Sequence, residues 1–143
     1  MKSLLMLAAA AGLLASSGCG GSKHPMVQVT GLVTVAGEAP PVDGVIVFSP
    51  VSVPTGGAMR PGTAPFGVSG KYRAGTFKAG DGLLPGKYRI SIQCWKTPPS
   101  AGGPPEVSYI DDKYTRMLTS GYTLDVEAGG DAIKLDLPLD AAR

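Results

Sequence analysis

Glycine and proline interrupt the apolar runs of this chain beyond residue 25, and this punctuation limits its fold more than any other feature. The 143 residues include 21 glycines and 13 prolines, without the fixed period of collagen. No window keeps the apolar period of a helix, whereas short β-branched and aromatic runs recur between the breaks. Because 43% of the residues are apolar and only 17% are charged, the chain can form a core. We therefore predict one small all-β domain.

Alternation of apolar and polar side chains defines the predicted strands. In the clearest one, residues 87–95, the even positions are apolar and are predicted to face the core: Tyr88, Ile90, Ile92 and Cys94. Residues 44–48 are apolar at consecutive positions, so this strand is predicted to be central and to end at Pro50. About seven strands, enough for two packed sheets, are predicted at 26–35, 44–48, 70–74, 75–78, 87–95, 122–126 and 133–139.

The connections between the strands carry further predictions. Gly31 marks a bulge or a close approach within the first strand. The last two strands are predicted to form a hairpin that turns at 128–131, with charged residues paired across its solvent face: Asp125, Glu127, Lys134 and Asp136. One helical turn is expected within 108–118. Two long loops rich in proline and glycine, 49–66 and 97–105, have roles that the sequence leaves open.

Residues 1–18 are predicted to be a targeting segment rather than part of the folded domain. Lys2, the uncharged run 4–15 and the small residues 16–18 are the three parts of a secretory signal peptide. The run is too short to cross a bilayer as a helix, which takes about 20 apolar residues. The next residues, Ser17-Gly18-Cys19-Gly20, resemble the lipobox of bacterial lipoproteins, although Ser16 stands where that motif usually has leucine.

The lipobox resemblance implies that Cys19 is acylated and becomes the mature N-terminus. Residues 19–25 would then be a lipidated tether, membrane lipid a partner, and the cell envelope the location, with Gly20 favouring the outer membrane. The alternative is conventional cleavage near Ser17, which leaves Cys19 free or bridged to Cys94, the other cysteine. We favour an acylated Cys19 and a buried Cys94, because Cys94 lies on a predicted core face.

The order of the elements resembles a known family. A Val-x-Gly-x-Val strand, the segment 44–50 (GVIVFSP) and the segment 84–92 (LPGKYRISI) are similar to the carboxypeptidase-regulatory-like domain. That family has a transthyretin-like (prealbumin-like), Ig-like β-sandwich, and small lipoproteins of bacterial envelopes often carry one copy. The resemblance covers residues 26–139 and is most specific at Pro85-Gly86-Lys87-Tyr88. The aspartate that the family usually has three residues before Gly70 is missing here.

Residues suited to catalysis or metal binding are few. His24 is the only histidine and lies in the tail, which cannot hold the geometry of a triad or a metal site. Cys94 has neither a base nor exposure in its predicted strand. Asp111-Asp112, the best acidic pair, fits a solvated loop or a helix N-terminus better than a calcium site. We predict no catalytic residue, metal or cofactor, and no nucleic-acid partner, because the net charge is only +2.

Trp95 is the candidate ligand-binding residue. It alternates out of the core face and borders the loop 97–105, so its ring can stack on a sugar or on an apolar group of a partner. The competing interpretation is that residues 97–99 fold back and cover it. The sequence favours a non-catalytic, membrane-anchored lipoprotein that binds or scaffolds an envelope protein or glycan. The alternative is a carbohydrate-binding accessory module that uses Trp95; the ligand and the oligomeric state stay open.

Overall fold

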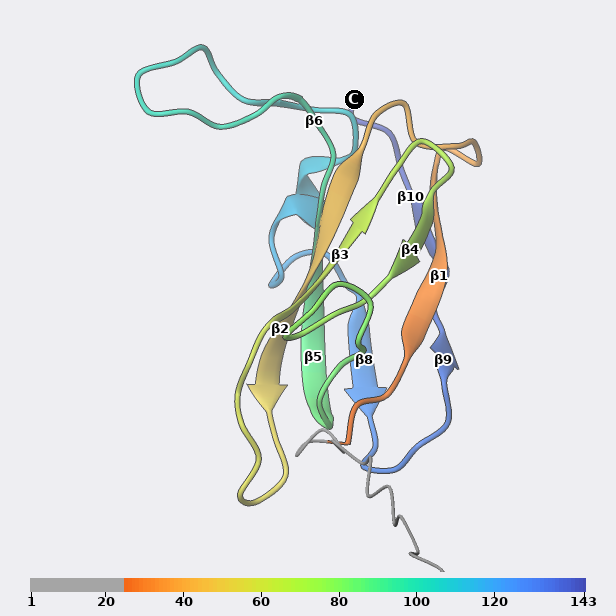
Figure 1. Cartoon of the computed structure of the whole chain (residues 1–143). Helices are drawn as coiled ribbons and strands as arrows, with labels where there is room; N and C mark the ends of the chain where they lie inside the picture. The colour runs from red at the N-terminus through yellow and green to blue at the C-terminus, as the bar shows by residue number, and fades with distance from the viewer. Residues whose placement is uncertain (1–24) are drawn as a thin grey trace, which may run out of the picture.

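The structure, a computed structural model, describes residues 25–143 and is an all-β, sandwich-like fold, as predicted (Figure 1). The signal peptide and residues 19–24 of the tether lie outside the described residues. The prediction of about seven strands was too low, because five strands of only two or three residues are too short to show alternation. The described elements are β1 (Val29–Val35), β2 (Gly44–Ser52), β3 (Gly62–Phe66), β4 (Lys71–Arg73), β5 (Gly86–Gln93), β6 (Trp95–Thr97), β7 (Val107–Ser108), the 3₁₀ turn η1 (Asp112–Thr115), β8 (Thr123–Val126), β9 (Ile133–Lys134) and β10 (Leu137–Leu139).

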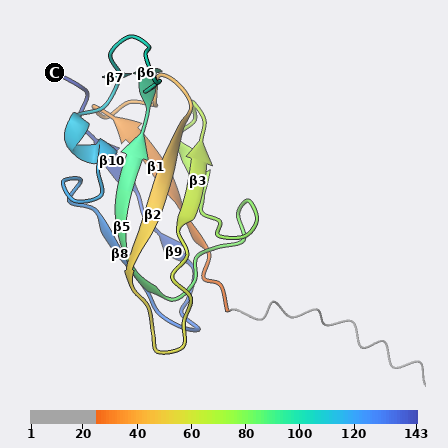
Figure 2. The same ribbon diagram turned by 90° about the vertical axis from the view of Figure 1, so that its left-hand side faces the viewer.

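One continuous sheet curls into two layers. Its strands follow the order β10-β1-β4-β3-β2-β5-β8, and β9 also pairs with β1. β3 and β4 meet through one residue pair, Phe66 with Tyr72, and at this corner the sheet turns over. Figure 2 shows β5, β2 and β3 in front of β1 and β10. The core lies between the layers, where the rings of Phe48 and Tyr72 have centroids 6.5 Å apart.

β1 confirms the predicted alternation and explains its glycine. Val29, Val33 and Val35 are buried, whereas Thr30 is exposed. A Cβ atom on Gly31 would lie 1.8 Å from the backbone oxygen of Leu135, which is far inside van der Waals contact. The glycine therefore allows the segment between β9 and β10 to approach the strand closely, and the close approach rather than the bulge is confirmed.

β5 is the centre of one layer and also confirms its predicted core face. Tyr88, Ile90, Ile92 and Cys94 are each at most 1% exposed. The strand ends at Gln93 rather than at residue 95, and a new strand, β6, begins at Trp95. The hydroxyl of Tyr88 donates a hydrogen bond of 2.8 Å to the backbone oxygen of Leu84. This bond ties the start of β5 to its preceding turn and gives the Leu-Pro-Gly-Lys-Tyr segment a physical role.

The predictions for residues 49–66 were wrong in two respects. β2 lies between β3 and β5, so it is central as predicted, but it continues through Pro50 to Ser52. Proline is tolerated there because β3 pairs with β2 only as far as Phe48, which leaves one side of β2 unpaired beyond that point. β3 occupies the end of the predicted loop, so the connection shortens to residues 53–61.

The closing hairpin and the strand at 75–78 were also wrong. β8 pairs with β5, whereas β9 and β10 both pair with β1 in parallel, so the chain crosses between layers at 127–132. Asp125 therefore forms its ion pair with Lys87, at 3.6 Å, and not across a hairpin. Residues 76–78 form a bend whose three backbone N–H groups donate to the carboxylate of Asp81. Among residues 25–143, no helix has the length and apolarity needed to cross a membrane.

Candidate functional site

A projecting hairpin, which we call the arm (residues 95–108), leaves one end of the sandwich. β6 and β7 pair at its root, through Trp95 with Ser108 and Thr97 with Val107. Beyond them lie two Pro-Pro pairs, 98–99 and 104–105, which have no N–H groups to continue the ladder. Residues 98–107 are all exposed, and Figure 1 shows this segment extending away from the layers. The arm therefore exposes its backbone and prolines to solvent rather than covering the core.

Trp95 lies at the root of the arm and is half-buried. Its strand partner Ser108 is only 8% exposed, and the Ser108 hydroxyl accepts a hydrogen bond of 3.1 Å from the N–H of Ile110. The predicted exposure of Trp95 is thus only partial. Pro98 and Pro99, which follow Trp95 in the arm, are both exposed.

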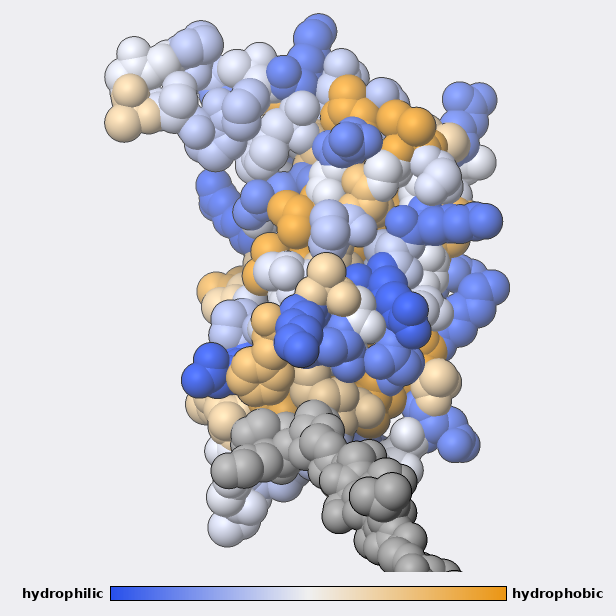
Figure 3. All heavy atoms as spheres, in the orientation of Figure 1, coloured by the Kyte–Doolittle hydropathy of each residue, from blue (hydrophilic) through white to orange (hydrophobic). Residues whose placement is uncertain are grey.

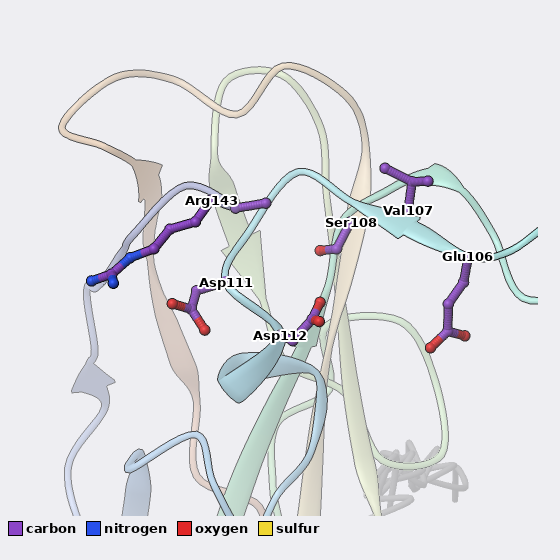
Figure 4. A pocket seen from close by; sticks show the side chains of 7 residues that line it. Glu106, Val107, Ser108, Asp111, Asp112 and Arg143 are labelled. Atoms are coloured by element: carbon purple, nitrogen blue, oxygen red, sulfur yellow. The ribbon is translucent and has the colours of Figure 1, made fainter.

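A shallow hollow of about 310 Å³ adjoins the arm (Figure 4). Its charged lining residues are three acidic ones, Glu106, Asp111 and Asp112, and Arg143. In Figure 4, Glu106 and Arg143 lie on opposite sides and the two aspartates lie between them. Carboxylates and a guanidinium can hydrogen-bond to hydroxyl or amide groups of a ligand. The remaining lining residues are Val107, Ser108 and Ala142.

The Asp111-Asp112 pair has the structural role that the sequence predicted. Asp111 caps η1, and its Oδ1 atom accepts a hydrogen bond of 3.0 Å from the N–H of Lys113. η1 itself confirms the expected helical turn, with Tyr114 buried beneath it. Within residues 25–143, no three carboxylate, histidine or cysteine side chains gather closely enough to hold a metal ion.

A polar network around η1 adjoins the aspartates of the hollow, and we call it the clasp (Lys113, Tyr114, Tyr122 and Asp140). Asp140 Oδ2 accepts hydrogen bonds from Lys113 Nζ at 2.6 Å and from Tyr114 Oη at 2.9 Å. The ring of Tyr114 stacks on that of Tyr122 with centroids 5.9 Å apart. Backbone bonds at Asp111 and Ala142 hold the chain end beside residues 109–111. The clasp therefore positions η1 and the aspartates of the hollow.

Electrostatics in the clasp follow from these hydrogen bonds. The bond from Lys113 is the main reason that the pKa of Asp140 lies below its usual value, and the Tyr114 hydroxyl adds to the effect. The same bond raises the pKa of Lys113. For Tyr122, burial is the first cause of a raised pKa. At neutral pH the clasp thus holds one carboxylate and one ammonium as a solvent-facing pair.

Cys94 is buried at the end of β5, as predicted. Its thiol is 0% exposed and lies 3.9 Å from the backbone oxygen of Val42. Burial raises the pKa of this thiol, which opposes formation of the nucleophilic thiolate. Cys19 and His24 lie outside the described residues, so the acylation of Cys19 and the alternative bridge to Cys94 stay predictions.

Sequence reasoning missed the hollow and the clasp. Both depend on the pairing of residues 140–142 with residues 109–111, which are about thirty positions away and carry no local signal of contact. The Tyr-rich spacing of Tyr109, Tyr114 and Tyr122 was the one available hint, because buried tyrosines need hydrogen-bond partners.

No protein-family model, no curated protein and no solved structure matches this chain. The similarity to the carboxypeptidase-regulatory-like domain, which rests on the segments at 29–33, 44–50 and 84–92, therefore stays a prediction.

Proposed function

We propose that the protein is a non-catalytic bacterial lipoprotein, anchored in the cell envelope through acylated Cys19, whose sandwich binds or scaffolds an envelope partner. In this proposal residues 1–18 are removed, residues 19–25 tether the domain to the outer membrane, and residues 26–139 form a carboxypeptidase-regulatory-like module. The lipobox at 17–20 supports the anchor, and the all-β sandwich supports the module.

The observation that carries this proposal is that Pro25 and the arm lie at opposite ends of the domain. The described chain begins at Pro25, beside the β2–β3 turn and the start of β5. The arm lies at the other end, as both ribbon views show (Figures 1 and 2). A chain anchored just before Pro25 would hold the arm on the side away from the lipid. The exposed hairpin would then be the part that meets other molecules.

The described residues that carry reactive groups support a binding role. The Cys94 thiol is buried, with a raised pKa. The carboxylates of Asp81 and Asp111 accept backbone N–H groups of turns, and that of Asp140 belongs to the clasp. Each of these groups has a structural use that accounts for its position.

Intact mass of the protein extracted from membranes of its native host tests the anchor. We expect a chain that begins at Cys19 and is heavier than its sequence by fatty-acyl groups. The Cys19→Ala variant should lack the added mass and leave the membrane fraction. An unmodified wild-type chain in the soluble fraction would overturn the proposal and would favour the secreted module.

Site-specific photo-cross-linking in cells tests the role of the arm. A photoreactive residue in place of Ala101, at the tip of the arm, should capture an envelope protein. The matched control replaces Thr55, which is also exposed but lies in the β2–β3 turn at the other end. Equal capture at both positions, or none at the tip, would contradict binding through the arm.

A second candidate, carbohydrate binding, is favoured by one further observation. Trp95 is paired in register with Ser108, which lines the hollow with Glu106, Asp111 and Asp112, so Trp95 lies on the strand next to these polar residues. Glycan-array binding that disappears in Trp95→Ala and is retained in Trp95→Phe, with both variants folded, would support this candidate. Binding that is unchanged in Trp95→Ala would remove Trp95 from the site.

A further inference from the structure

The β2–β3 turn (residues 53–61) is an uncharged protrusion. From Val53 to Met59 it has no charged residue, and Met59 is 58% exposed. The first cation is Arg60, whose guanidinium carbon lies 5.1 Å from the centroid of the Phe77 ring. Figure 1 places this turn at the lower end of the sandwich, and in Figure 3 the same region is pale, of intermediate hydropathy.

The turn has a defined shape. The N–H of Gly57 donates a hydrogen bond of 2.8 Å to the backbone oxygen of Pro54, and Gly56 has a φ of +78°. That left-handed conformation suits glycine, so the two glycines close a tight turn at the tip. Val53 is half-buried and attaches the turn to the sandwich. Met59 is thus held on an ordered turn.

The chain leaves the described domain beside this turn. Pro25 lines a hollow of about 250 Å³ together with Pro54, residues 55–58, Leu84, Pro85 and Ala128, and none of these residues is charged. Five residues, 20–24, separate Pro25 from Cys19. The distance from Cys19 to Pro25 is at most about 21 Å, because a fully extended chain advances by at most about 3.5 Å per residue. An acyl chain on Cys19 therefore holds the turn within that distance of the lipid.

We propose that the β2–β3 turn contacts the lipid surface, with the side chain of Met59 in the boundary between headgroups and acyl chains. This inference rests on the proposed acylation of Cys19. One exposed methionine gives only weak affinity, but a short tether raises the effective concentration of the surface to the millimolar range. The connection between β8 and β9, whose Ala128 lines the same hollow, carries the acidic residues Glu127 and Asp131. Because these carboxylates repel anionic lipid, the contact depends on burial of apolar surface more than on electrostatic attraction.

The single tryptophan makes this contact measurable. Trp95 lies at the opposite end of the sandwich, so the wild-type protein reports on the part that faces away from lipid. The test variant combines Met59→Trp with Trp95→Phe in the full chain, expressed with lipoprotein processing. The matched control combines Leu118→Trp with Trp95→Phe, because Leu118 is 71% exposed and lies after η1. Intact mass and circular dichroism establish acylation and folding for each protein.

Each protein is reconstituted in phosphatidylethanolamine–phosphatidylglycerol vesicles, with and without brominated acyl chains. We expect the Met59→Trp protein to lose fluorescence in brominated vesicles and to emit at shorter wavelength, while the wild type and the Leu118→Trp protein keep their intensity. An acylated Met59→Trp protein that keeps its intensity would overturn the lipid contact and leave the anchor intact. Equal losses in all three proteins would also overturn it. A mass without acyl groups would overturn the anchor, and this inference with it.

Discussion

Tyr122, which precedes β8, donates its hydroxyl hydrogen to the backbone oxygen of Pro138 in β10. β8 and β10 are the two ends of the sheet order, so this bond joins the outer strands of opposite layers without any backbone ladder between them. Tyr114 of η1 stacks on Tyr122 and reaches Asp140, one residue beyond β10. The open side of the sandwich is therefore closed by side chains.

The first prediction concerns acid stability. In the folded protein the pKa of Asp140 lies below 3.8, because its carboxylate accepts hydrogen bonds from Lys113 and Tyr114. The unfolded chain binds the proton more readily, so this stabilisation is complete above the unfolded pKa and is lost as pH falls through the folded pKa. We expect the urea midpoint to fall more steeply below about pH 4 in the wild type than in Asp140→Asn.

The control for this experiment is Asp131→Asn, which changes an exposed turn aspartate and should keep the wild-type steepness. If Asp140→Asn and the wild type fall in parallel, the hydrogen bonds to Asp140 do not stabilise the fold.

The second prediction concerns Gly31. The backbone oxygen of Leu135 occupies the place of a Cβ atom, so Gly31→Ala should displace residues 133–139 and lower the free energy of unfolding by about 1–3 kcal/mol. Gly67→Ala is the matched control, since its Cβ would meet Asp43 Oδ1 at 3.5 Å, an ordinary contact. Urea unfolding followed by circular dichroism measures both. Equal stabilities of the two variants would contradict the close approach.

The third prediction concerns the reactivity of Cys94. The thiol is buried and its pKa is raised by burial, so a disulfide reagent should label it only on unfolding. In a Cys19→Ala background the native protein should react slowly and the protein in urea rapidly. Adding Leu118→Cys supplies an exposed thiol that should react at once. Rapid labelling of native Cys94 would show that the end of β5 opens readily.

The fourth prediction concerns Asp81. Its carboxylate accepts hydrogen bonds from the backbone N–H groups of Thr76, Phe77 and Lys78, at 2.7, 3.2 and 3.0 Å. Asp81→Ala leaves these donors without that acceptor, and we expect a loss of about 1–3 kcal/mol in the free energy of unfolding. Asp125→Ala, which removes only the exposed ion pair to Lys87, should cost less than about 1 kcal/mol. If Asp125→Ala lowered the free energy of unfolding more than Asp81→Ala, the larger structural role assigned to Asp81 would be contradicted.

Local patterns predicted the faces of the strands better than their partners. The buried valines of β1 and the even positions of β5 follow from a period of two, which each strand carries in its own residues. The hairpin prediction failed because the alternation in residues 133–139 does not reveal whether they pair with β8 or with β1. The prediction that β2 ends at Pro50 failed for a similar reason. A strand tolerates proline where its neighbour no longer pairs with it, and the residue at which the pairing with β3 stops cannot be seen in the sequence of β2.

The candidate site was harder to predict than the fold. Trp95 could be placed beside the loop 97–105 from its position in the sequence. Arg143 and Ala142, by contrast, reach the hollow only through the pairing of residues 140–142 with residues 109–111. That pairing is a tertiary contact, and the sequence around Arg143 carries no period or motif that signals it.

The parallel pairing of β1 with β9 and β10 has a consequence for biogenesis. β1 obtains these neighbours only after residues 133–139, about a hundred positions later, have been synthesised. Contacts of such large sequence separation make folding slow, because a long loop must close before they form. In the lipoprotein that we propose, such slow folding would keep the chain able to pass through a secretion channel before it folds.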